Sequence, residues 1–122
     1  MSNSRQKIGR RGEDIAAEYL AQKGYRIITR NFRTPLGEID IVARDKSSIV
    51  FIEVKSRTGA GYGSPASAVT LKKQQQISRA ALIYIKNHNL NDSPARFDVV
   101  SILFSGGSSR IELITDAFEL CS

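Results

Sequence analysis

Several features that would place the chain in a specialised class are missing from it. The 122 residues include one cysteine, Cys121, one histidine, His88, and no tryptophan. An intrachain disulfide is therefore excluded, and His88 lacks neighbours at metal-ligand spacing, which makes it a surface residue at a helix end. No run of about 18 apolar residues occurs, and the basic N-terminus is not followed by the apolar segment of a signal peptide. We expect a soluble, cytoplasmic protein that does not associate with membranes.

The charge balance points to an anionic partner. Eighteen Lys and Arg residues against twelve Asp and Glu residues leave a net charge of +6, and 41% of the residues are hydrophobic. A chain of this length and composition forms one domain with a single modest core, so we expect residues 1–122 to fold as a single unit. The excess of positive charge favours nucleic acid as the partner.

Hydrophobic periodicity predicts the element order α-β-β-β-α-β-β. Short turns make the first three strands antiparallel neighbours, and the helical crossover allows the fourth to join them in parallel. We expect an α/β fold with a mixed five-stranded sheet and a helix on each side. The loop 57–67, with three glycines and a proline, breaks all periodicity and is a candidate for substrate contact. The predicted elements are helices 7–23 and 68 to about 87, and strands 25–33, 38–44, 48–56, 95–104 and 110–118.

The hairpin formed by the second and third strands carries four charges inside apolar runs. If Lys46 and Ser47 form a two-residue turn, the paired residue numbers sum to 93. This register places Asp40 opposite Glu53 and Glu38 opposite Lys55, all on one face. The other face would then hold the apolar residues Ile39, Ile41, Val50, Ile52 and Val54.

Two carboxylates that face each other across a strand pair destabilise it by roughly 0.2 to 1 kcal/mol. A hard divalent cation would offset this repulsion, because Mg²⁺ takes carboxylate oxygens and keeps waters that a phosphate oxygen can replace. Lys55, two residues from Glu53 on the same face, could then hold a water or stabilise developing negative charge. Together these groups predict a site that cleaves phosphodiesters. The alternative is a solvated charge network in which Lys55 pairs with Glu38.

A resemblance to a known family agrees with this interpretation. The segments "GRRGEDIAAEYL", "GEIDIVARD", "FIEVKSR", "GSPASAV" and "RFDVV" resemble the YraN family, which is similar to the archaeal Holliday junction resolvases of the PD-(D/E)xK nuclease superfamily. The resemblance implies a restriction-endonuclease-like core. It also implies that Asp40, Glu53 and Glu13 hold Mg²⁺ or Mn²⁺, with help from the Val54 carbonyl, and that Lys55 positions the attacking water. Four-way DNA junctions as substrate and a homodimer that cuts two strands follow from the same likeness.

We therefore expect a metal-dependent DNA endonuclease directed to branched structures. A nucleic-acid-binding module of the same fold, acting with partner proteins and without useful cleavage, is the main alternative, and a structural protein is a third. The roles of Glu38, Asp98 and the loosely matching glutamines 74–76 stay open. The residues expected to contact DNA phosphates are Arg10, Arg11, Arg33, Arg57, Lys72 and Lys73.

Overall fold

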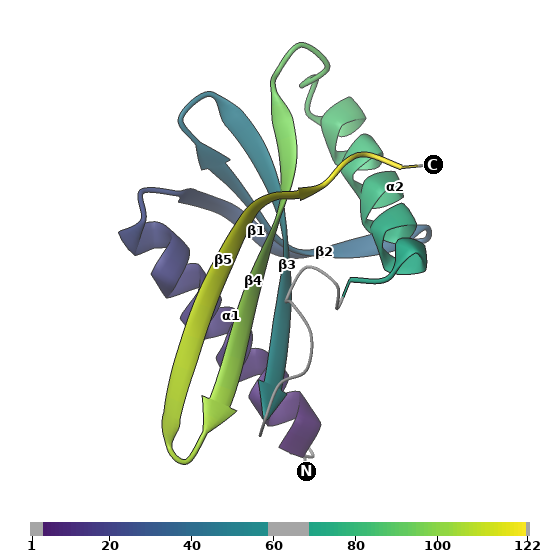
Figure 1. Cartoon of the computed structure of the whole chain (residues 1–122). Helices are drawn as coiled ribbons and strands as arrows, with labels where there is room; N and C mark the ends of the chain where they lie inside the picture. Colours follow the sequence, from purple (N-terminus) through teal and green to yellow (C-terminus); the bar gives the residue numbers. More distant parts are fainter. Residues whose placement is uncertain (1–3, 59–68, 122) are drawn as a thin grey trace.

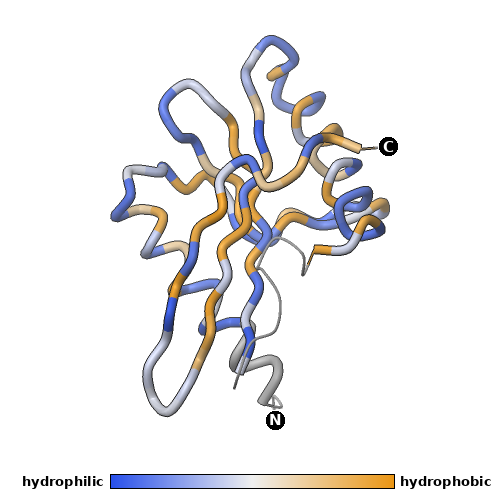
Figure 2. Tube along the Cα trace, viewed as in Figure 1, coloured by the Kyte–Doolittle hydropathy of each residue, from blue (hydrophilic) through white to orange (hydrophobic). Residues whose placement is uncertain are grey.

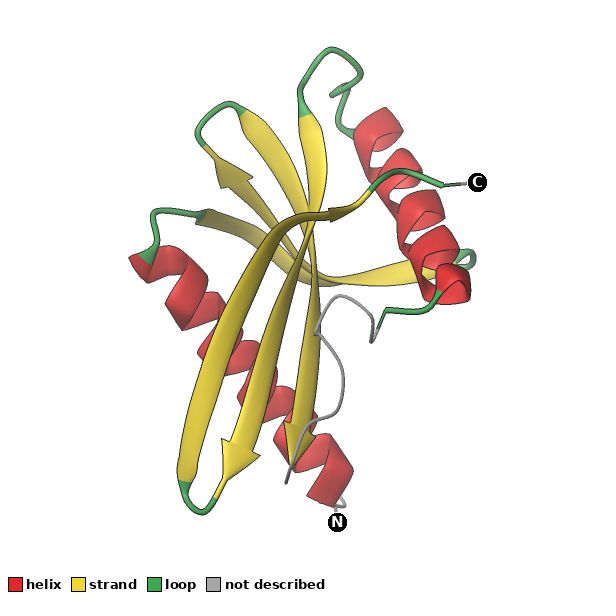
Figure 3. Ribbon diagram, in the orientation of Figure 1, coloured by secondary structure: helices red, strands yellow, loops and turns green. Residues whose placement is uncertain are grey.

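A computed structural model describes residues 4–58 and 69–121, with side chains from Arg10 onward. The helices and strands follow one another in the predicted order (Figures 1 and 3). No helix in the described part of the chain is long and apolar enough to cross a membrane. The predicted contact loop falls mostly on residues 59–68, which lie outside the described residues. The elements are α1 Ser4–Gln22, β1 Arg26–Thr34, β2 Gly37–Asp45, β3 Ser48–Thr58, α2 Leu71–Asn87, β4 Ala95–Ser105 and β5 Ser108–Phe118.

The strands form one mixed sheet in the order β1-β2-β3-β4-β5. β3 and β4 are parallel, and the other neighbouring pairs are antiparallel. α1 and α2 flank the sheet on opposite faces (Figure 3). The α/β architecture predicted from periodicity is confirmed, and it is consistent with a restriction-endonuclease-like core.

The helix boundaries differ from the prediction by a few residues. α1 begins at Ser4, three residues before the predicted start, and α2 begins at Leu71 rather than Ala68. The later start of α2 has a local cause, because Thr70 is its N-cap and the Thr70 hydroxyl accepts the N–H of Lys73 at 3.1 Å. Apolar spacing alone does not distinguish a capping residue from the first turn.

Each face of the sheet buries its own apolar cluster, and the hydrophobic colour is concentrated on the strands (Figure 2). The α1 cluster contains Ala16 and Leu20 of the helix, with Ile41 and Ile52 of the sheet. The α2 cluster is built mainly from Ile39, Val42, Ile49, Phe51, Ile77, Ala80, Ala81, Tyr84, Phe97 and Val99. The charged face of the predicted hairpin is thus the face that α2 covers.

The β2–β3 register is the predicted one. Asp45 pairs with Ser48 and Ile41 pairs with Ile52, so the numbers sum to 93. The paired ladder ends at Ile41 and Ile52, however. Before Ile41, β2 pairs only with β1, while β3 pairs only with β4 beyond Ile52. The two strands therefore fork, and β2 runs away from β3 toward the start of α2 (Figure 1).

One predicted face assignment is wrong because of this fork. We expected Ile39 to share a face with Ile41, but Ile39 packs in the α2 cluster and Ile41 in the α1 cluster. The regular alternation of side chains between the two faces of the sheet is broken at Asp40, where β2 ceases to pair with β3 and pairs only with β1. Asp40 consequently lies at the point where the two strands separate, rather than in a regular cross-strand pair.

Candidate active site

The fork brings Asp40 and Glu53 together at its base. In place of a ladder bond, the Asp40 carboxylate accepts the backbone N–H of Val54, with Oδ2 2.8 Å from the nitrogen. This bond fixes Asp40 against the residue that follows Glu53. The predicted approach of the two carboxyl groups is therefore present, although they meet at the end of the ladder rather than within it.

Glu53 is almost completely withdrawn from water. Its exposure is 6%, and its Oε2 atom has no hydrogen-bond partner. Burial raises the pKa of Glu53 to about 9, and the adjacent Asp40 adds to the rise by its hydrogen bond and charge. Lys73 and Lys55 oppose this rise. In the absence of a metal ion, the raised pKa means that Glu53 keeps its proton at neutral pH.

Two lysines contribute positive charge to this site. Lys55 follows Glu53 on the same strand face, as predicted, and is half-buried. Lys73, from the first turn of α2, places its Nζ 3.7 Å from Glu53 Oε2. Lys73 was predicted to contact DNA phosphates. Its contact with Glu53 was not predicted, because the position of α2 over β3 is a tertiary feature that local sequence does not contain.

Glu13 of α1 approaches the acid pair from the other helix. Burial raises the pKa of Glu13, and the charge of Asp40 contributes further, whereas Asn31 and Arg30 lower it. Arg30 Nη2 lies 3.6 Å from Glu13 Oε1 and donates to Asp14 Oδ1 at 2.8 Å. Glu13 is thus electrostatically linked to Asp40 but held by β1. Its predicted role as a third metal ligand stays a prediction.

Arg30 and Asn31 were not identified from the sequence. The backbone of Asn31 has a φ of 55° inside a strand, a conformation that asparagine tolerates better than most residues. The sequence signal for this backbone conformation is weak, because it consists only of an asparagine before an aromatic residue in a strand rich in β-branched residues. Nothing in the sequence indicates that Asn31 contacts Glu13 of α1.

The predicted pairing of Glu38 with Lys55 is wrong. Glu38 pairs with Arg33 on β1, where Glu38 Oε2 is 3.6 Å from Arg33 Nε, and both side chains are exposed. The cause is again the fork, which takes Glu38 away from β3. Glu38 therefore does not orient Lys55, and the solvated network that relied on this pair is not formed.

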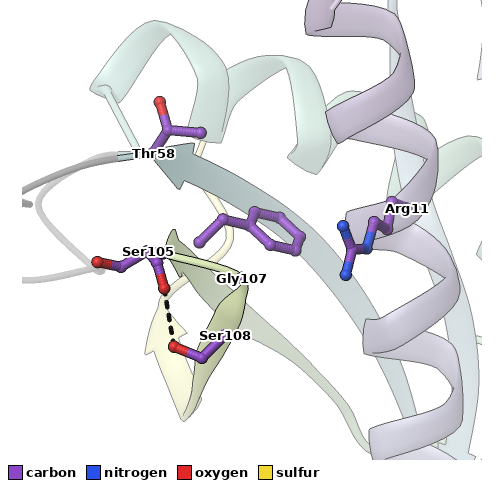
Figure 4. Close-up of a pocket in the computed structure, with 7 residues that line it drawn as sticks. Arg11, Thr58, Ser105, Gly107 and Ser108 are labelled. Atoms are coloured by element: carbon purple, nitrogen blue, oxygen red, sulfur yellow. Dashed lines mark hydrogen bonds between the residues drawn. The ribbon is translucent and has the colours of Figure 1, made fainter.

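The predicted DNA-contacting residues do not all lie in one place. Arg33 and Lys72 are exposed beside the β1–β2 turn and the start of α2, and Arg57 is half-buried near the end of β3. Arg10 is exposed on α1. Arg11 lies over the Phe104 ring, 5.2 Å from its centroid, and lines a separate cavity of about 350 Å³ at the tip of the β4–β5 hairpin (Figure 4).

Asp98 lies away from the acid pair, on the α1 face. It is fully buried and accepts hydrogen bonds from Tyr25 Oη at 2.8 Å, Arg96 Nε at 3.1 Å and the Asp116 N–H at 2.9 Å. Arg96 also bonds Asp45 Oδ2 at 2.7 Å. These bonds tie β4 to β2, to β5 and to Tyr25 in the connection between α1 and β1, so Asp98 has a structural role.

His88 and Gln74 make local helix contacts. His88 is exposed at the C-cap of α2, as predicted, and its ring stacks on Tyr84. Gln74 donates from Nε2 to the Val69 carbonyl at 3.0 Å, near the start of the same helix. Neither contact involves the acid pair.

The acid pair has the chemistry that a small divalent cation requires. Mg²⁺ and Mn²⁺ bind carboxylate oxygens, and Glu53 Oε2 is a buried acceptor that receives no hydrogen bond and lies beside a second carboxyl group. No group of three or more His, Cys, Asp or Glu side chains positioned to hold a metal occurs among the described residues. A cation here would therefore take two protein carboxylates and complete its coordination with waters and substrate oxygens, which is the usual habit of Mg²⁺.

The chain is similar to known proteins over nearly its whole length. A UPF0102 protein of Geobacter metallireducens is 52% identical over 120 residues, which is 98% of each chain. Another from Geobacter sulfurreducens is 56% identical over 114 residues, covering 93% of this chain and 89% of the relative. Residues 12–102 match the model described as uncharacterised protein family UPF0102. The chain therefore belongs to family UPF0102, which is the YraN family that its motifs resemble.

Proposed function

We propose that this protein is a divalent-cation-dependent endonuclease that hydrolyses phosphodiester bonds in branched DNA. The observation that carries the proposal is the buried Glu53 carboxyl group beside Asp40, with Lys55 two residues further along the same strand face. Burying the Glu53 carboxyl group beside a second acid costs free energy, and a core without a function would be more stable with an apolar residue there. A bound cation would remove this cost and give the arrangement a use.

Each residue would have a distinct task. Asp40 and Glu53 would hold Mg²⁺ or Mn²⁺, and Glu13 would add negative charge from α1. When bound, the cation supplies Lewis-acid stabilisation of the charge that gathers on the scissile phosphate. The Lys55 ammonium would orient the attacking water or stabilise the same charge. Lys73 would exchange its contact with Glu53 for one with a DNA phosphate.

The substrate part of the proposal has its own support. The net charge of +6 favours a polyanion, and Arg33 and Lys72 are exposed near the fork. The preference for four-way junctions, and a homodimer that cuts two strands, come from the resemblance to the archaeal resolvases. Junctions are therefore the first substrate to test, with linear duplex as the comparison.

Replacing Lys55 with alanine is expected to lower the cleavage rate about 10²- to 10³-fold, because one preorganised donor to the transition state is lost. The affinity for DNA should change little. The measurement is single-turnover cleavage of labelled four-way junction, flap, linear duplex and single-stranded DNA with Mg²⁺, Mn²⁺ or EDTA. Lys86→Ala, which removes an exposed lysine in the last turn of α2, is the matched control and should cut at the wild-type rate.

A second candidate is a DNA-binding module without cleavage. The observation in its favour is that Lys73 already supplies a positive charge to Glu53, while the described residues offer no three-acid metal group. Salt-sensitive binding of junctions by the wild-type protein, with no cutting in any metal, would favour this function. Metal-dependent cutting that Lys55→Ala loses would reject it.

A further inference from the structure

The turn between β1 and β2 presents an exposed leucine on a rigid support. Leu36 is 54% exposed. The turn beneath it is closed by the Thr34 hydroxyl, which donates to the Gly37 carbonyl at 2.8 Å and accepts the N–H groups of Leu36 and Gly37 at 3.1 and 3.0 Å. Pro35 fixes a further backbone dihedral. The Leu36 side chain is therefore held in a defined position rather than on a mobile loop.

The turn is also fixed to α2. Gly37 lies so close to the backbone carbonyl of Gln76 that a Cβ atom at residue 37 would overlap it. Only glycine permits this approach. Since the same helix carries Lys73, the position of Leu36 relative to the acid pair is set by the fold.

Basic residues outnumber acidic ones around Leu36. A cavity of about 360 Å³ beside the turn is lined by Arg33, Leu36, Glu38 and Lys73, among others. Glu38 Oε2 lies 3.6 Å from Arg33 Nε, so a DNA phosphate would replace Glu38 as the partner of Arg33. Arg33 is 76% exposed at the rim, and the neighbouring Lys72 is exposed as well. Lys73, which lines this cavity, is also the residue that contacts Glu53. Lys73 thus connects the cavity beside Leu36 to the acid pair.

We propose that Leu36 is a wedge that inserts between neighbouring bases of DNA, while Arg33 and Lys72 hold the flanking phosphates. Apolar side chains that unstack a base step occur in DNA-binding proteins together with basic phosphate contacts. Unstacking costs least where base pairing is already interrupted. The wedge would therefore select junctions, nicks and bulges over continuous duplex. This inference rests on the proposed function and specifies the substrate class of the same site.

Charge complementarity favours DNA over a protein as the partner of this surface. A protein partner that covered Leu36 would have to desolvate Arg33 and Lys72 at the rim or supply acids for them. A DNA strand supplies a phosphate for each basic residue and an apolar gap for the leucine. A second copy of this chain, which carries the same basic rim, would bring like charges together.

The geometry also predicts where the cut falls. Leu36, in the turn that precedes β2, comes four residues before Asp40, and a strand rises about 3.3 Å per residue, so the backbones of the two residues are at most about 13 Å apart. The spacing along one DNA strand is about 3.4 Å per nucleotide. Cleavage is expected within about four nucleotides of the unstacked step.

The test uses base stacking rather than cleavage. Oligonucleotides with 2-aminopurine at the branch point, one nucleotide away or in plain duplex are titrated with protein in EDTA, and fluorescence and affinity are recorded. We expect the wild-type protein to raise fluorescence at one branch-point position. Leu36→Ala should lose at least half of this rise and bind branched DNA about fivefold more weakly, with no change for plain duplex. Leu120→Ala removes another leucine that is 54% exposed and should match the wild type.

The outcomes separate the wedge from the nuclease. No fluorescence rise with wild-type protein, or an equal rise with Leu36→Ala, overturns the wedge even if the protein cuts DNA. A fluorescence rise that is present in the wild type and in Leu120→Ala but lost in Leu36→Ala supports the wedge, even if the protein does not cut DNA with any metal. In that case the proposed cleavage activity would be rejected and the wedge would stand. Light scattering measures the oligomeric state of each variant. If the Leu36→Ala substitution changed the oligomeric state but neither the fluorescence nor the DNA affinity, the wedge would be overturned in favour of a contact between copies of the chain.

Discussion

Replacing Glu53 with glutamine is expected to abolish metal-dependent cleavage and to make the metal-free protein more stable. Loss of a carboxylate ligand removes several kcal/mol of charge stabilisation in the transition state, and each 1.36 kcal/mol is a factor of ten in rate, so cleavage should fall about a thousandfold or more. The gain in stability has a separate cause, which is the burial of Glu53 beside Asp40. Single-turnover cleavage and urea unfolding in EDTA measure the two effects.

The stability change should depend on pH with a defined sign. Burial and Asp40 raise the pKa of Glu53 from 4.5 to about 9 in the folded state. Between these values the folded protein binds more protons than the unfolded chain, so the free energy of unfolding decreases as pH rises. Glutamine does not titrate and avoids this loss. The variant should exceed the wild type by on the order of 2 kcal/mol at pH 8, with the difference disappearing near pH 4.5.

Glu38→Gln is the matched control, because Glu38 is an exposed acid on β2 that pairs with Arg33 at the surface. It should change the free energy of unfolding by less than about 0.5 kcal/mol and leave cleavage intact. A Glu53→Gln protein that is less stable than the wild type at pH 8, or whose advantage is the same at every pH, would contradict the claim that the buried Glu53 carboxyl group destabilises the metal-free protein.

Asp98→Ala is expected to cause the largest loss of stability, about 3 to 5 kcal/mol, since it leaves Arg96 and the Tyr25 hydroxyl without their buried acceptor. Burial, together with Asp98, raises the pKa of Tyr25 to about 12, so the phenol remains a neutral donor in the network. Thermal unfolding at pH 7 measures the effect. Asp98→Asn retains the shape of the side chain and should lose less stability than Asp98→Ala.

Asp45→Ala is the comparison within the same network. Asp45 also bonds Arg96 but is partly exposed, so its removal should cost about 1 kcal/mol or less. Below its unfolding temperature, Asp98→Asn should bind and cut DNA like the wild type, because Asp98 and Glu53 lie on opposite faces of the sheet. A folded Asp98→Asn protein that has lost cleavage would place Asp98 in the site instead.

The β2–β3 register could be predicted because a two-residue turn at Lys46 and Ser47 leaves only one pairing. The element order was also predictable, because the hydrophobic residues of this chain repeat at helical spacing in some segments and at strand spacing in others. The mixed sheet followed from the helix that connects the third strand to the fourth. The proximity of Asp40 and Glu53 followed directly from the register. These features depend on short stretches of sequence, and for them local information was sufficient.

The fork could not be predicted in this way. It depends on β2 leaving β3 after Ile41, which the contact of Gly37 with Gln76 of α2 helps to fix, and that contact joins segments 39 residues apart. The wrong face for Ile39 and the wrong partner for Glu38 both follow from assuming that the ladder continues. The approach of Lys73 to Glu53 was missed because the position of α2 over β3 is a tertiary feature. Local patterns predicted that Asp40 and Glu53 approach each other, but not the way the strands separate around them.

The most direct test of the account is to measure Mn²⁺ binding to the wild-type protein and to the variants Asp40→Asn, Glu53→Gln and Glu38→Gln. Binding is detected by the enhancement of water-proton relaxation, a method that also detects weak sites. The account predicts one Mn²⁺ site in the wild type and in Glu38→Gln, lost in both Asp40→Asn and Glu53→Gln. Absence of binding by the wild type, or equal binding by Glu53→Gln, would contradict the claim that the buried acid pair at the fork holds a divalent cation.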